Sequence, residues 1–333
     1  MDLLREPDID PAPLAGKRVV IIGYGNQGRA QALNLRDSGI DVTIGLRTGS
    51  ATIPEVETAG FAHLPPAQAT AIADLVMLLA PDETLSEIYA NIEPQLRPGT
   101  AIGFSHGLAI RFGLIRPRPD LDVIMVAPKG PGTALRSLYE NGQGMVALWA
   151  VTQDGSGDAR GLALAYGAAI GCARAGLVAS TFAEECEADL FNEQAVVWGA
   201  VPEILIAGFD TLVAGGISPE VAFMECVGEL KLLADLIEAR GIAGMREAIS
   251  NTAELGATLG GPKIVDDRVR ESMVRILASI RSGEFASALG REFAGGYPAL
   301  RVARERARNL AVEQAGATVA ALGPTRTLSP ARD

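Results

Sequence analysis

The sequence predicts two domains: an α/β domain over residues 1–180, then an all-α domain over residues 181–326, with a short tail at 327–333. Two observations support this division. In the first half, short apolar runs rich in β-branched residues alternate with helical patterns, which is typical of a parallel sheet covered by helices. From about Thr181 the strand pattern stops and long helical patterns replace it. A chain of 333 residues is long enough for two such cores.

The composition excludes several classes of protein. The net charge of −11 argues against nucleic acid as a partner. The opening residues MDLLREPDID lack the basic and apolar segments of a secretory signal, and no run reaches the ~18 uninterrupted apolar residues of a membrane span. Three scattered cysteines form no CxxC pair, which argues against a disulfide framework. We therefore expect a cytoplasmic protein with no membrane partner.

The first strand is expected at 17–23 (KRVVIIG), and a glycine turn follows it directly. The turn GYGNQG places Gly23, Gly25 and Gly28 in GxGxxG spacing. A helical pattern closed by Gly39 and a second strand at 41–46 come next. This order of strand, glycine turn, helix and strand predicts a Rossmann domain that binds a dinucleotide. The helix N-terminus would then present free N–H groups to the pyrophosphate.

The end of the second strand indicates which dinucleotide is bound. NAD-binding domains usually carry an acidic residue there, about 20 residues beyond the turn, for the ribose 2′-hydroxyl. This sequence instead has LRTGSAT, with Arg47, Ser50 and Thr52. A guanidinium and two hydroxyls suit a 2′-phosphate, so we predict NADPH. The alternative is a solvated arginine beside ordinary loop hydroxyls.

Further strands are expected at 73–80, 100–105, 121–127, 145–151 and 175–180. The first three are followed by the polar loops PDETL (81–85), FSHG with His106, and PKGPG (128–132). Ligands bind beyond the carboxyl ends of strands in open α/β sheets, so these loops should share one crevice. His106 would therefore lie beside the nicotinamide, whereas His63 is expected in a surface loop.

In the second half, residues 182–216 are expected to form one long helix that kinks near 199–201, because Pro202 lies inside it. Ser218 and Pro219 predict the start of another helix, and Gly241 predicts its end. Helical patterns continue to about residue 322.

Each of these two helices carries a pair of carboxylates four residues apart, Asp189 with Glu193 and Glu225 with Glu229. A like-charged pair costs ~0.2–0.5 kcal/mol even on an exposed helix, and an unpaired buried carboxylate costs far more. The sequence has no Lys or Arg between residues 175 and 230. Divalent cations would compensate, and oxygen ligands favour Mg²⁺, Ca²⁺ or Mn²⁺. Four carboxylates suit two ions with one bridging ligand; the alternative is two solvated acidic faces that never meet.

Several motifs together carry a family resemblance. In order, they are GYGNQGRAQALNLRDSG, GLRTGSAT, PDETLSEIY, FSHG, VIMVAPKGPG, EADLFNEQAVVWG, MECVGELKL and ISNTAELG. Their order and spacing resemble those of ketol-acid reductoisomerase in its short, class I form, over about residues 1 to 320. The resemblance implies an α-helical C-terminal domain of the knotted type.

The resemblance also implies an activity. A 2-acetohydroxy acid (2-acetolactate or 2-aceto-2-hydroxybutyrate) would bind two Mg²⁺ ions, an alkyl group would migrate between adjacent carbons, and NADPH would reduce the resulting ketone to a 2,3-dihydroxy acid. This chemistry serves valine and isoleucine biosynthesis. The second carboxylate pair would come from a partner subunit, so a homodimer or larger homo-oligomer would build the site.

Residue roles follow from the matching motif positions. Asp189 would bridge the two ions, Glu193 would bind one of them, and Glu225 with Glu229 would bind the other. The residues that match the remaining functional positions are His106, Lys129 and Glu229 for catalysis, Ser250 for substrate, and Tyr24, Gly25, Asn26, Gln27, Arg47, Ser50, Thr52, Asp82, Glu83, Thr84, Leu85 and Gly132 for the cofactor.

The sequence departs from the family pattern close to these positions. The family usually has Thr at position 188, Gly at 192 and His at 228, where this chain has Ala188, Asn192 and Gly228. Val-Trp-Gly-Ala at 197–200 replaces Leu-Cys-Gly-Gly, and Val197 is expected to share the helix face of Glu193 and to enlarge the pocket. A paralogue with a different substrate and a non-catalytic NADP-binding paralogue therefore stay open.

A third alternative is a metal-free β-hydroxyacid dehydrogenase, which also joins a Rossmann domain to helices. It would need a catalytic lysine in the helical half and would have no carboxylate cluster. The two carboxylate pairs argue against it.

Overall fold

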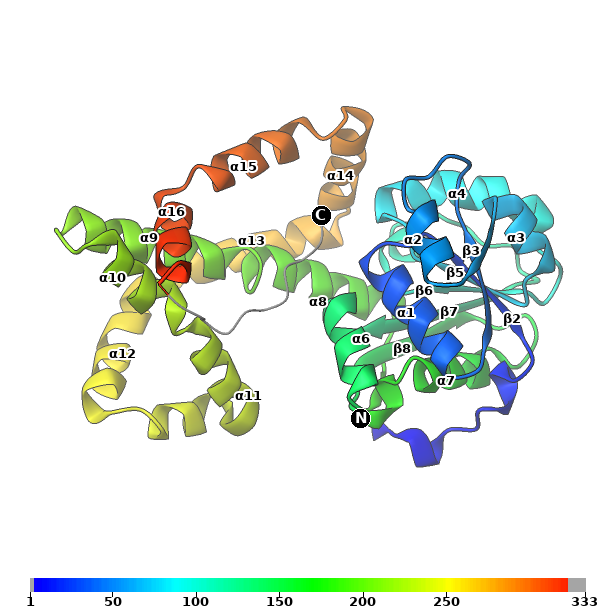
Figure 1. Cartoon of the computed structure of the whole chain (residues 1–333), viewed down its shortest axis with the longest axis horizontal. Helices are drawn as coiled ribbons and strands as arrows, with labels where there is room; N and C mark the ends of the chain where they lie inside the picture. Colours follow the sequence, from blue (N-terminus) through cyan, green and yellow to red (C-terminus); the bar gives the residue numbers. More distant parts are fainter. Residues whose placement is uncertain (1–2, 323–333) are drawn as a thin grey trace. The chain divides into compact units, whose positions relative to one another are not determined.

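The computed structural model describes residues 3–322 and divides into two compact units, Met1–Ala188 and Asp189–Asp333. Figure 1 shows an α/β unit with a central sheet and a unit built of helices. The division falls inside helix α8 (Phe182–Ala195), so residues of one helix belong to both units. The tail expected at 327–333 lies outside the described residues.

Within the described residues, the first unit contains one nine-stranded sheet in the order β1-β9-β8-β7-β6-β5-β2-β3-β4. The strands are β1 (Leu3–Leu4), β2 (Arg18–Ile22), β3 (Asp41–Gly45), β4 (Ala62–Leu64), β5 (Leu75–Leu78), β6 (Ala101–Phe104), β7 (Asp122–Pro128), β8 (Ala147–Gln153) and β9 (Leu177–Ala179). Strands β2 to β7 are parallel, whereas β8 runs antiparallel to β7. The predicted Rossmann domain and its seven expected strands are therefore confirmed.

Helices cover both faces of the sheet. One face carries α1 (Asn26–Asp37), α2 (Ile53–Thr58), α6 (Gly132–Glu140) and α7 (Ala159–Ala169), and the other carries α3 (Pro66–Ile72), α4 (Leu85–Ile92) and α5 (Leu108–Arg111). Along β2, Val19 and Ile21 join the first core, and Val20 and Ile22 join the second. Both sides of the strand are buried, which explains its continuous apolar run.

The prediction of a surface loop around His63 is wrong. His63 lies in the edge strand β4, where it pairs with Ile44 of β3, and its side chain is 30% exposed. Its Nε2 atom lies 3.2 Å from Glu57 Oε1. A strand of three residues followed by two prolines is too short to show a period-2 pattern in the sequence.

The second unit consists of helices. They are the end of α8, then α9 (Ala200–Ala214), α10 (Pro219–Phe223), α11 (Leu230–Glu247), α12 (Asn251–Ile264), α13 (Asp267–Arg281), α14 (Glu284–Ala294), α15 (Pro298–Arg308) and α16 (Ala311–Ala320). The helix expected from Ser218 does begin there, and the chain leaves helical geometry at Gly241, where φ is 68°. A π-helical turn at Met224–Gly228, which the sequence pattern does not predict, separates α10 from α11.

The long helix expected over 182–216 is two helices. Helix α8 ends at Ala195 and α9 begins at Ala200, so Val197 does not share a helix face with Glu193, and that prediction is wrong. The chain turns tightly here. Gly199 approaches the Gln194 carbonyl group so closely that a Cβ atom at position 199 would overlap it, so the turn requires glycine. Pro202 then lies in the first turn of α9, where its missing N–H costs nothing.

Counted across this turn, Phe182–Ala214 is long and apolar enough to cross a membrane by length and composition alone. Charged residues interrupt its apolar run, so the sequence shows no uninterrupted span there. It is the one such segment among residues 3–322, with 6% of its most apolar window buried, and a single segment of this kind is weak evidence for a membrane span.

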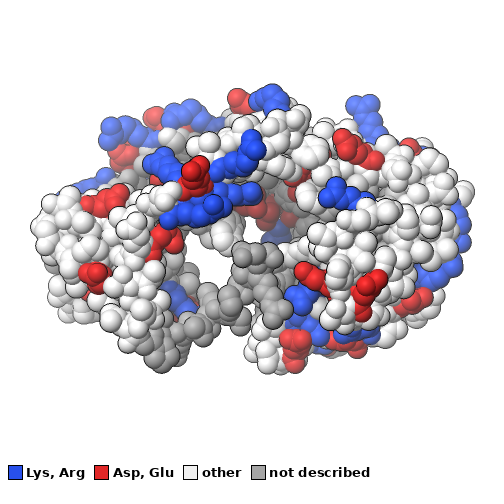
Figure 2. Space-filling view, turned by 45° about the horizontal axis from the view of Figure 1, so that its top comes forward, with Lys and Arg blue, Asp and Glu red and all other residues white. Residues whose placement is uncertain are grey.

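Among residues 189–322, few large side chains are buried. One buried cluster comprises Phe209, Ala222, Val312 and Ala315, and Leu190 and Ile280 are buried elsewhere. Large apolar side chains are exposed along the helices of the second unit, including Ile242, Leu255, Leu259 and Val274, and Trp198 is exposed in the turn between α8 and α9. On the face shown in Figure 2, basic and acidic side chains are interspersed and uncharged residues cover most of the area.

Candidate active site

A cleft of about 350 Å³ opens in the first unit beyond the carboxyl ends of β2, β5 and β6. The strand order reverses between β2 and β5, and this switch point is where open α/β sheets bind their ligands. The cleft is lined by Gly23, Tyr24, Gly25, Asn26, Gln27, Leu78, Leu79, Ala80, Pro81, Asp82, Leu85, Ser105 and His106. Six predicted cofactor residues and His106 are therefore brought together at one opening.

The three glycines of the turn serve three different purposes. Gly23 has φ of 98°, and a Cβ atom there would lie 2.8 Å from the Leu79 carbonyl oxygen. A Cβ atom on Gly28 would lie 2.5 Å from the carbonyl oxygen of Gly23, so this glycine allows α1 to pack on the turn. A Cβ atom on Gly25 would meet nothing within 4 Å. Gly25 therefore leaves room for a ligand at the N-terminus of α1, as dinucleotide binding requires.

The loop after β7 is fastened to the glycine turn. Gln27 Nε2 donates a hydrogen bond of 2.9 Å to the Gly130 carbonyl oxygen, and the Gly132 N–H donates to Asn26 Oδ1. A Cβ atom on Gly132 would overlap the Asn26 carbonyl group, so this position accepts only glycine without a backbone shift. Gly132 thus contacts Asn26 of the glycine turn without lining the cleft itself.

The remaining predicted cofactor residues lie in two loops. Between β3 and α2, Arg47 is exposed, and the Ser50 and Thr52 hydroxyl oxygens are 2.9 Å apart. Between β5 and α4, residues Asp82–Thr84 form a 3₁₀ turn. Arg47, Ser50, Thr52, Glu83 and Thr84 do not line the cleft itself.

The centre of the polar site is Glu185, a residue that the sequence reasoning missed. Its side chain is 1% exposed. Oε1 accepts a hydrogen bond of 2.7 Å from Lys129 Nζ. Oε2 accepts one of 2.8 Å from the Gly107 N–H and lies 3.1 Å from His106 Nδ1. The predicted catalytic residues His106 and Lys129 are thus joined through one buried carboxylate.

The charges of this group stabilise one another. Burial lowers the pKa of His106, but hydrogen bonds to Cys186 and Glu185 and the charges of Glu185 and Asp82 outweigh it and raise the pKa to about 11. Burial likewise raises the pKa of Glu185, and His106 with Lys129 outweighs burial, so the net shift is downward. At neutral pH the group is therefore an imidazolium and an ammonium around a carboxylate.

The first two turns of α8 are held against the loop after β6. Arg111 donates from Nε and Nη2 to Glu187 Oε1, at 3.0 and 2.9 Å. A Cβ atom on Gly107 would overlap the Phe182 carbonyl group, so only glycine allows this close approach. The Phe104 and Phe182 rings also meet edge to face at 5.9 Å. These contacts hold the start of α8 against β6, α5 and the loop between them.

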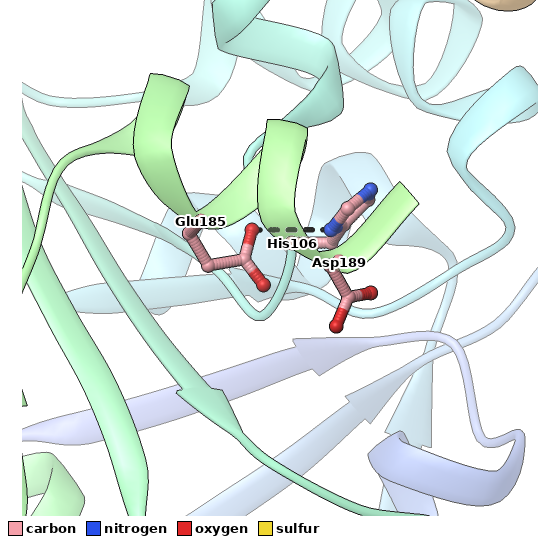
Figure 3. A group of neighbouring side chains, drawn as sticks. All are labelled: His106, Glu185 and Asp189. Carbon is pink, nitrogen blue, oxygen red and sulfur yellow. Dashed lines mark hydrogen bonds and ion pairs between the residues drawn. The ribbon is translucent and has the colours of Figure 1, made fainter. Parts of the chain in front are cut away.

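Asp189 lies one helical turn beyond Glu185 on α8 (Figure 3). One ligand atom each from His106, Glu185 and Asp189 lies within 4.8 Å of the others, a spacing that could hold a metal ion. Both Glu185 oxygens already accept hydrogen bonds, so Glu185 suits the orientation of His106 and Lys129 better than metal ligation. Asp189 is the better metal ligand of the three. Sequence spacing could have revealed Glu185, because it stands four residues before Asp189 as Glu193 stands four after.

The other predicted site residues lie in the second unit. Glu225 is in the π-helical turn, and Glu229 follows it directly. The regular α-helical stacking expected for this pair is therefore wrong, although π-helical turns are common at functional sites. Ser250 is the N-cap of α12, where its Oγ accepts a hydrogen bond of 3.2 Å from the Ala253 N–H. The roles of these residues in metal and substrate binding stay predictions.

Two family models together match most of the chain. The NADPH-binding domain of acetohydroxy acid isomeroreductase matches residues 13–176, and the C-terminal domain of ketol-acid reductoisomerase matches residues 182–325.

Solved structures agree with this assignment. An NADH-preferring ketol-acid reductoisomerase from an uncultured archean is 42% identical, with 98% of this chain and 100% of that chain covered and a TM-score of 0.94. A semialdehyde dehydrogenase NAD-binding protein from Cupriavidus necator (22% identity, 80% and 99% covered, TM-score 0.59) and a pyrroline carboxylate reductase from Plasmodium falciparum (11%, 83% and 99%, TM-score 0.53) share the fold alone. The chain therefore belongs to the ketol-acid reductoisomerase family, whose members are oxidoreductases that use a nicotinamide cofactor.

Proposed function

We propose that this protein is an Mg²⁺-dependent ketol-acid reductoisomerase. It converts 2-acetolactate and 2-aceto-2-hydroxybutyrate to 2,3-dihydroxy acids in the cytoplasm, as a step of valine and isoleucine biosynthesis. The observation that carries the proposal is the position of Asp189, one helical turn from a buried Glu185 that joins His106 and Lys129 at the mouth of a nicotinamide cleft.

The donor set fits the proposed metal. Asp189, Glu193, Glu225 and Glu229 offer hard carboxylate oxygens without cysteine, which suits Mg²⁺. When bound, the two ions supply Lewis acidity that stabilises negative charge on the substrate oxygens during alkyl migration. Lys129 and His106 add positive charge at the same place, and Glu185 holds both of them in fixed orientations.

The decisive experiment follows cofactor oxidation at 340 nm with 2-acetolactate as substrate, with and without Mg²⁺. We expect turnover that requires both the substrate and the metal. Oxidation that proceeds equally well in excess chelator would contradict the two-metal reaction, and no oxidation with any acetohydroxy acid would favour the non-catalytic paralogue.

For the cofactor we propose NADPH. The loop from Leu46 to Thr52 contains no acidic residue, and Arg47 is exposed beside the paired hydroxyls of Ser50 and Thr52. The archaeal relative prefers NADH, so the family includes both preferences. Comparing kcat/KM for the two cofactors decides between them. Replacement of both Ser50 and Thr52 by Asp should shift preference toward NADH, because carboxylates repel the 2′-phosphate.

We further propose that the active form is a homodimer or a larger homo-oligomer with a shared site. The second unit leaves many large apolar side chains exposed, such as Trp198 at 66%. An apolar surface of this kind is typical of an obligate interface between copies.

If Asp189 of one subunit works with Glu229 of another, mixing Asp189→Asn with Glu229→Gln should restore about a quarter of wild-type activity, because half of the dimers are hybrids and each hybrid has one intact site. Hybrid dimers without activity would contradict the shared site.

One observation favours a second candidate, a paralogue with an altered substrate range. The departures from the family pattern, Ala188 and Asn192, lie on α8 beside Asp189, and Asn192 is half-buried. A change of one methylene in a pocket alters selectivity by about 1–3 kcal/mol, so the shift would be graded. Comparison of kcat/KM for 2-acetolactate, 2-aceto-2-hydroxybutyrate and a longer homologue tests it. Rejection of the longer substrate would leave the ordinary biosynthetic role.

A further inference from the structure

A buried tyrosine lies at the start of a chain of hydrogen bonds that ends in the cofactor cleft. Tyr166 on α7 is fully buried in the core between the sheet and its helices. Its hydroxyl donates a hydrogen bond of 2.7 Å to Gln31 Oε1. Gln31, on α1, is also fully buried. An apolar pair of similar size would fill this space without the cost of burying polar groups, so the two residues call for an explanation.

The chain continues from Gln31 to two residues of the cleft. Gln31 Nε2 donates to Ser105 Oγ at 2.9 Å and to Gln27 Oε1 at 3.0 Å. Both Gln27 and Ser105 line the cleft, and Ser105 is the neighbour of His106 in the loop after β6. One buried amide therefore holds the polar side chains on two different walls of the cofactor cleft.

The far ends of the chain determine the direction of every hydrogen bond in it. Gln27 Nε2 donates to the Gly130 carbonyl oxygen, and Ser105 Oγ donates to the Val126 carbonyl oxygen at 2.9 Å. Because a carbonyl oxygen can only accept, the amide of Gln27 must present its oxygen to Gln31. Gln31 must then present its NH₂ group to the cleft residues and its oxygen to Tyr166.

In this series of hydrogen bonds, Tyr166 supplies the donor that Gln31 Oε1 needs. Burial raises the pKa of Tyr166 well above 10, and the nearby Cys172 adds a smaller upward shift, so the hydroxyl keeps its proton. Without that donor, Gln31 Oε1 would be buried without a partner, so the side-chain conformation in which Gln31 donates to Ser105 and Gln27 would lose stability relative to its alternatives.

We propose that Tyr166 is a positioning residue for the cofactor: through Gln31 it fixes the orientations of Gln27 and Ser105 against the nicotinamide dinucleotide. Tyr166 lines no part of the cleft, and no motif of the sequence marks it. The inference rests on the proposed cofactor site, and it predicts an effect on cofactor binding from a residue whose hydroxyl is linked to the cleft through Gln31.

The test compares Tyr166→Phe with wild type and with Tyr89→Phe. Tyr89 is a suitable control because it is also buried and its hydroxyl donates to Glu93 Oε1 at 3.2 Å, away from the cleft residues. The dissociation constant of NADPH is measured by fluorescence titration, well below each variant's melting temperature. Loss of one hydrogen bond corresponds to roughly 3- to 10-fold weaker cofactor binding in Tyr166→Phe. We expect no change in Tyr89→Phe, and we expect the cofactor KM to rise more than kcat falls.

A second variant separates positioning from stability. In Gln31→Met the link between Tyr166 and the cleft is gone, and Gln27 and Ser105 lose the donor that Gln31 Nε2 supplies. If Tyr166 acts through Gln31, adding Tyr166→Phe to Gln31→Met should weaken NADPH binding no further, although it can still change the melting temperature. A further loss of affinity in the double variant would overturn the proposal, as would wild-type affinity in Tyr166→Phe. Failure of the wild-type protein to bind either nicotinamide cofactor would overturn the proposed function as well.

Discussion

The two units of this protein differ in how far one chain completes them. The first unit buries both faces of its sheet, and at its polar site each oxygen of Glu185 meets a donor from the same unit. The second unit is built of helices that expose large apolar side chains and carry the pair Glu225 and Glu229 without a lysine or arginine nearby in the sequence before Lys231. This difference is the one expected if cofactor binding needs a single subunit and the proposed metal site needs a second.

The largest expected effect tests the residue at which the two units join. In Asp189→Asn the proposed bridging ligand loses its charge, so isomerisation of 2-acetolactate should fall by more than about 100-fold. NADPH should still bind with wild-type affinity, because its cleft lies in the first unit. Asp210→Asn, an exposed change on α9, serves as the control. Normal isomerisation in Asp189→Asn would refute the assignment of Asp189.

A change at Glu185 tests whether the first unit is complete in itself. Glu185→Gln keeps the shape of the side chain but leaves Lys129 and His106 without their buried counter-charge. We expect unfolding to become easier by about 3–5 kcal/mol and kcat to fall about 10- to 100-fold. Thermal unfolding and steady-state kinetics measure the two effects. The exposed neighbour Glu184→Gln should change neither, and equal behaviour of the two variants would contradict the central place of Glu185.

Hydrogen exchange tests the comparison across the whole chain. If the second unit depends on another copy, amides of α11 and α12 should exchange faster when the protein is diluted, by about tenfold for each 1.4 kcal/mol of lost stabilisation. Amides of β2, β5 and β6 should exchange at a rate that does not depend on protein concentration. Mass spectrometry at two concentrations measures both sets. Equal responses would show that the two units do not differ in this way.

The smallest expected effect concerns an ion pair at the opposite end of the sheet. Asp74 pairs with Arg18 and Arg97; burial raises its pKa, but hydrogen bonds to both arginines outweigh it and lower the pKa. A lowered pKa contributes stability above the unfolded value of 3.8, and the contribution is lost as the pH falls through the folded value. Asp74→Asn should therefore cost about 1 kcal/mol at pH 7 and less below pH ~4. Asp41→Asn, an exposed change on β3, should cost nothing measurable at either pH.

The parts of the fold that follow from local patterns were predictable. Buried parallel strands have continuous β-branched runs, so seven strands could be found, whereas β1 and β4 have two and three residues and show no pattern. The glycine turn was predictable because its spacing is a local sequence pattern, in which Gly23 and Gly28 relieve close contacts and Gly25 leaves open space. The π-helical turn at Met224–Gly228 and the break after Ala195 depend on tertiary packing that leaves no periodic signal.

The candidate site was predictable only in part, for a similar reason. His106 and Lys129 could be found because each follows a strand in a recognisable loop. Their common partner Glu185 is 79 residues from His106 and 56 from Lys129 in the sequence, and it lies in an acidic stretch whose members look alike. The four-residue spacing to Asp189 places Glu185 on the face of the proposed metal ligand, but only the folded chain shows that Glu185 is buried and Glu184 exposed.

The close approach of Gly107 to Phe182 has a consequence for which positions of this chain can change. A Cβ atom on Gly107 would overlap the Phe182 carbonyl group and lie 3.1 Å from Cys186 Cβ, so any other residue at position 107 must push the start of α8 away from the sheet. Such a shift would also break the hydrogen bond from the Gly107 N–H to Glu185 and, with it, the orientation of His106 and Lys129. A single missing methyl group thus determines whether the buried carboxylate can do its work, whereas the exposed Ala188 can be replaced without moving it.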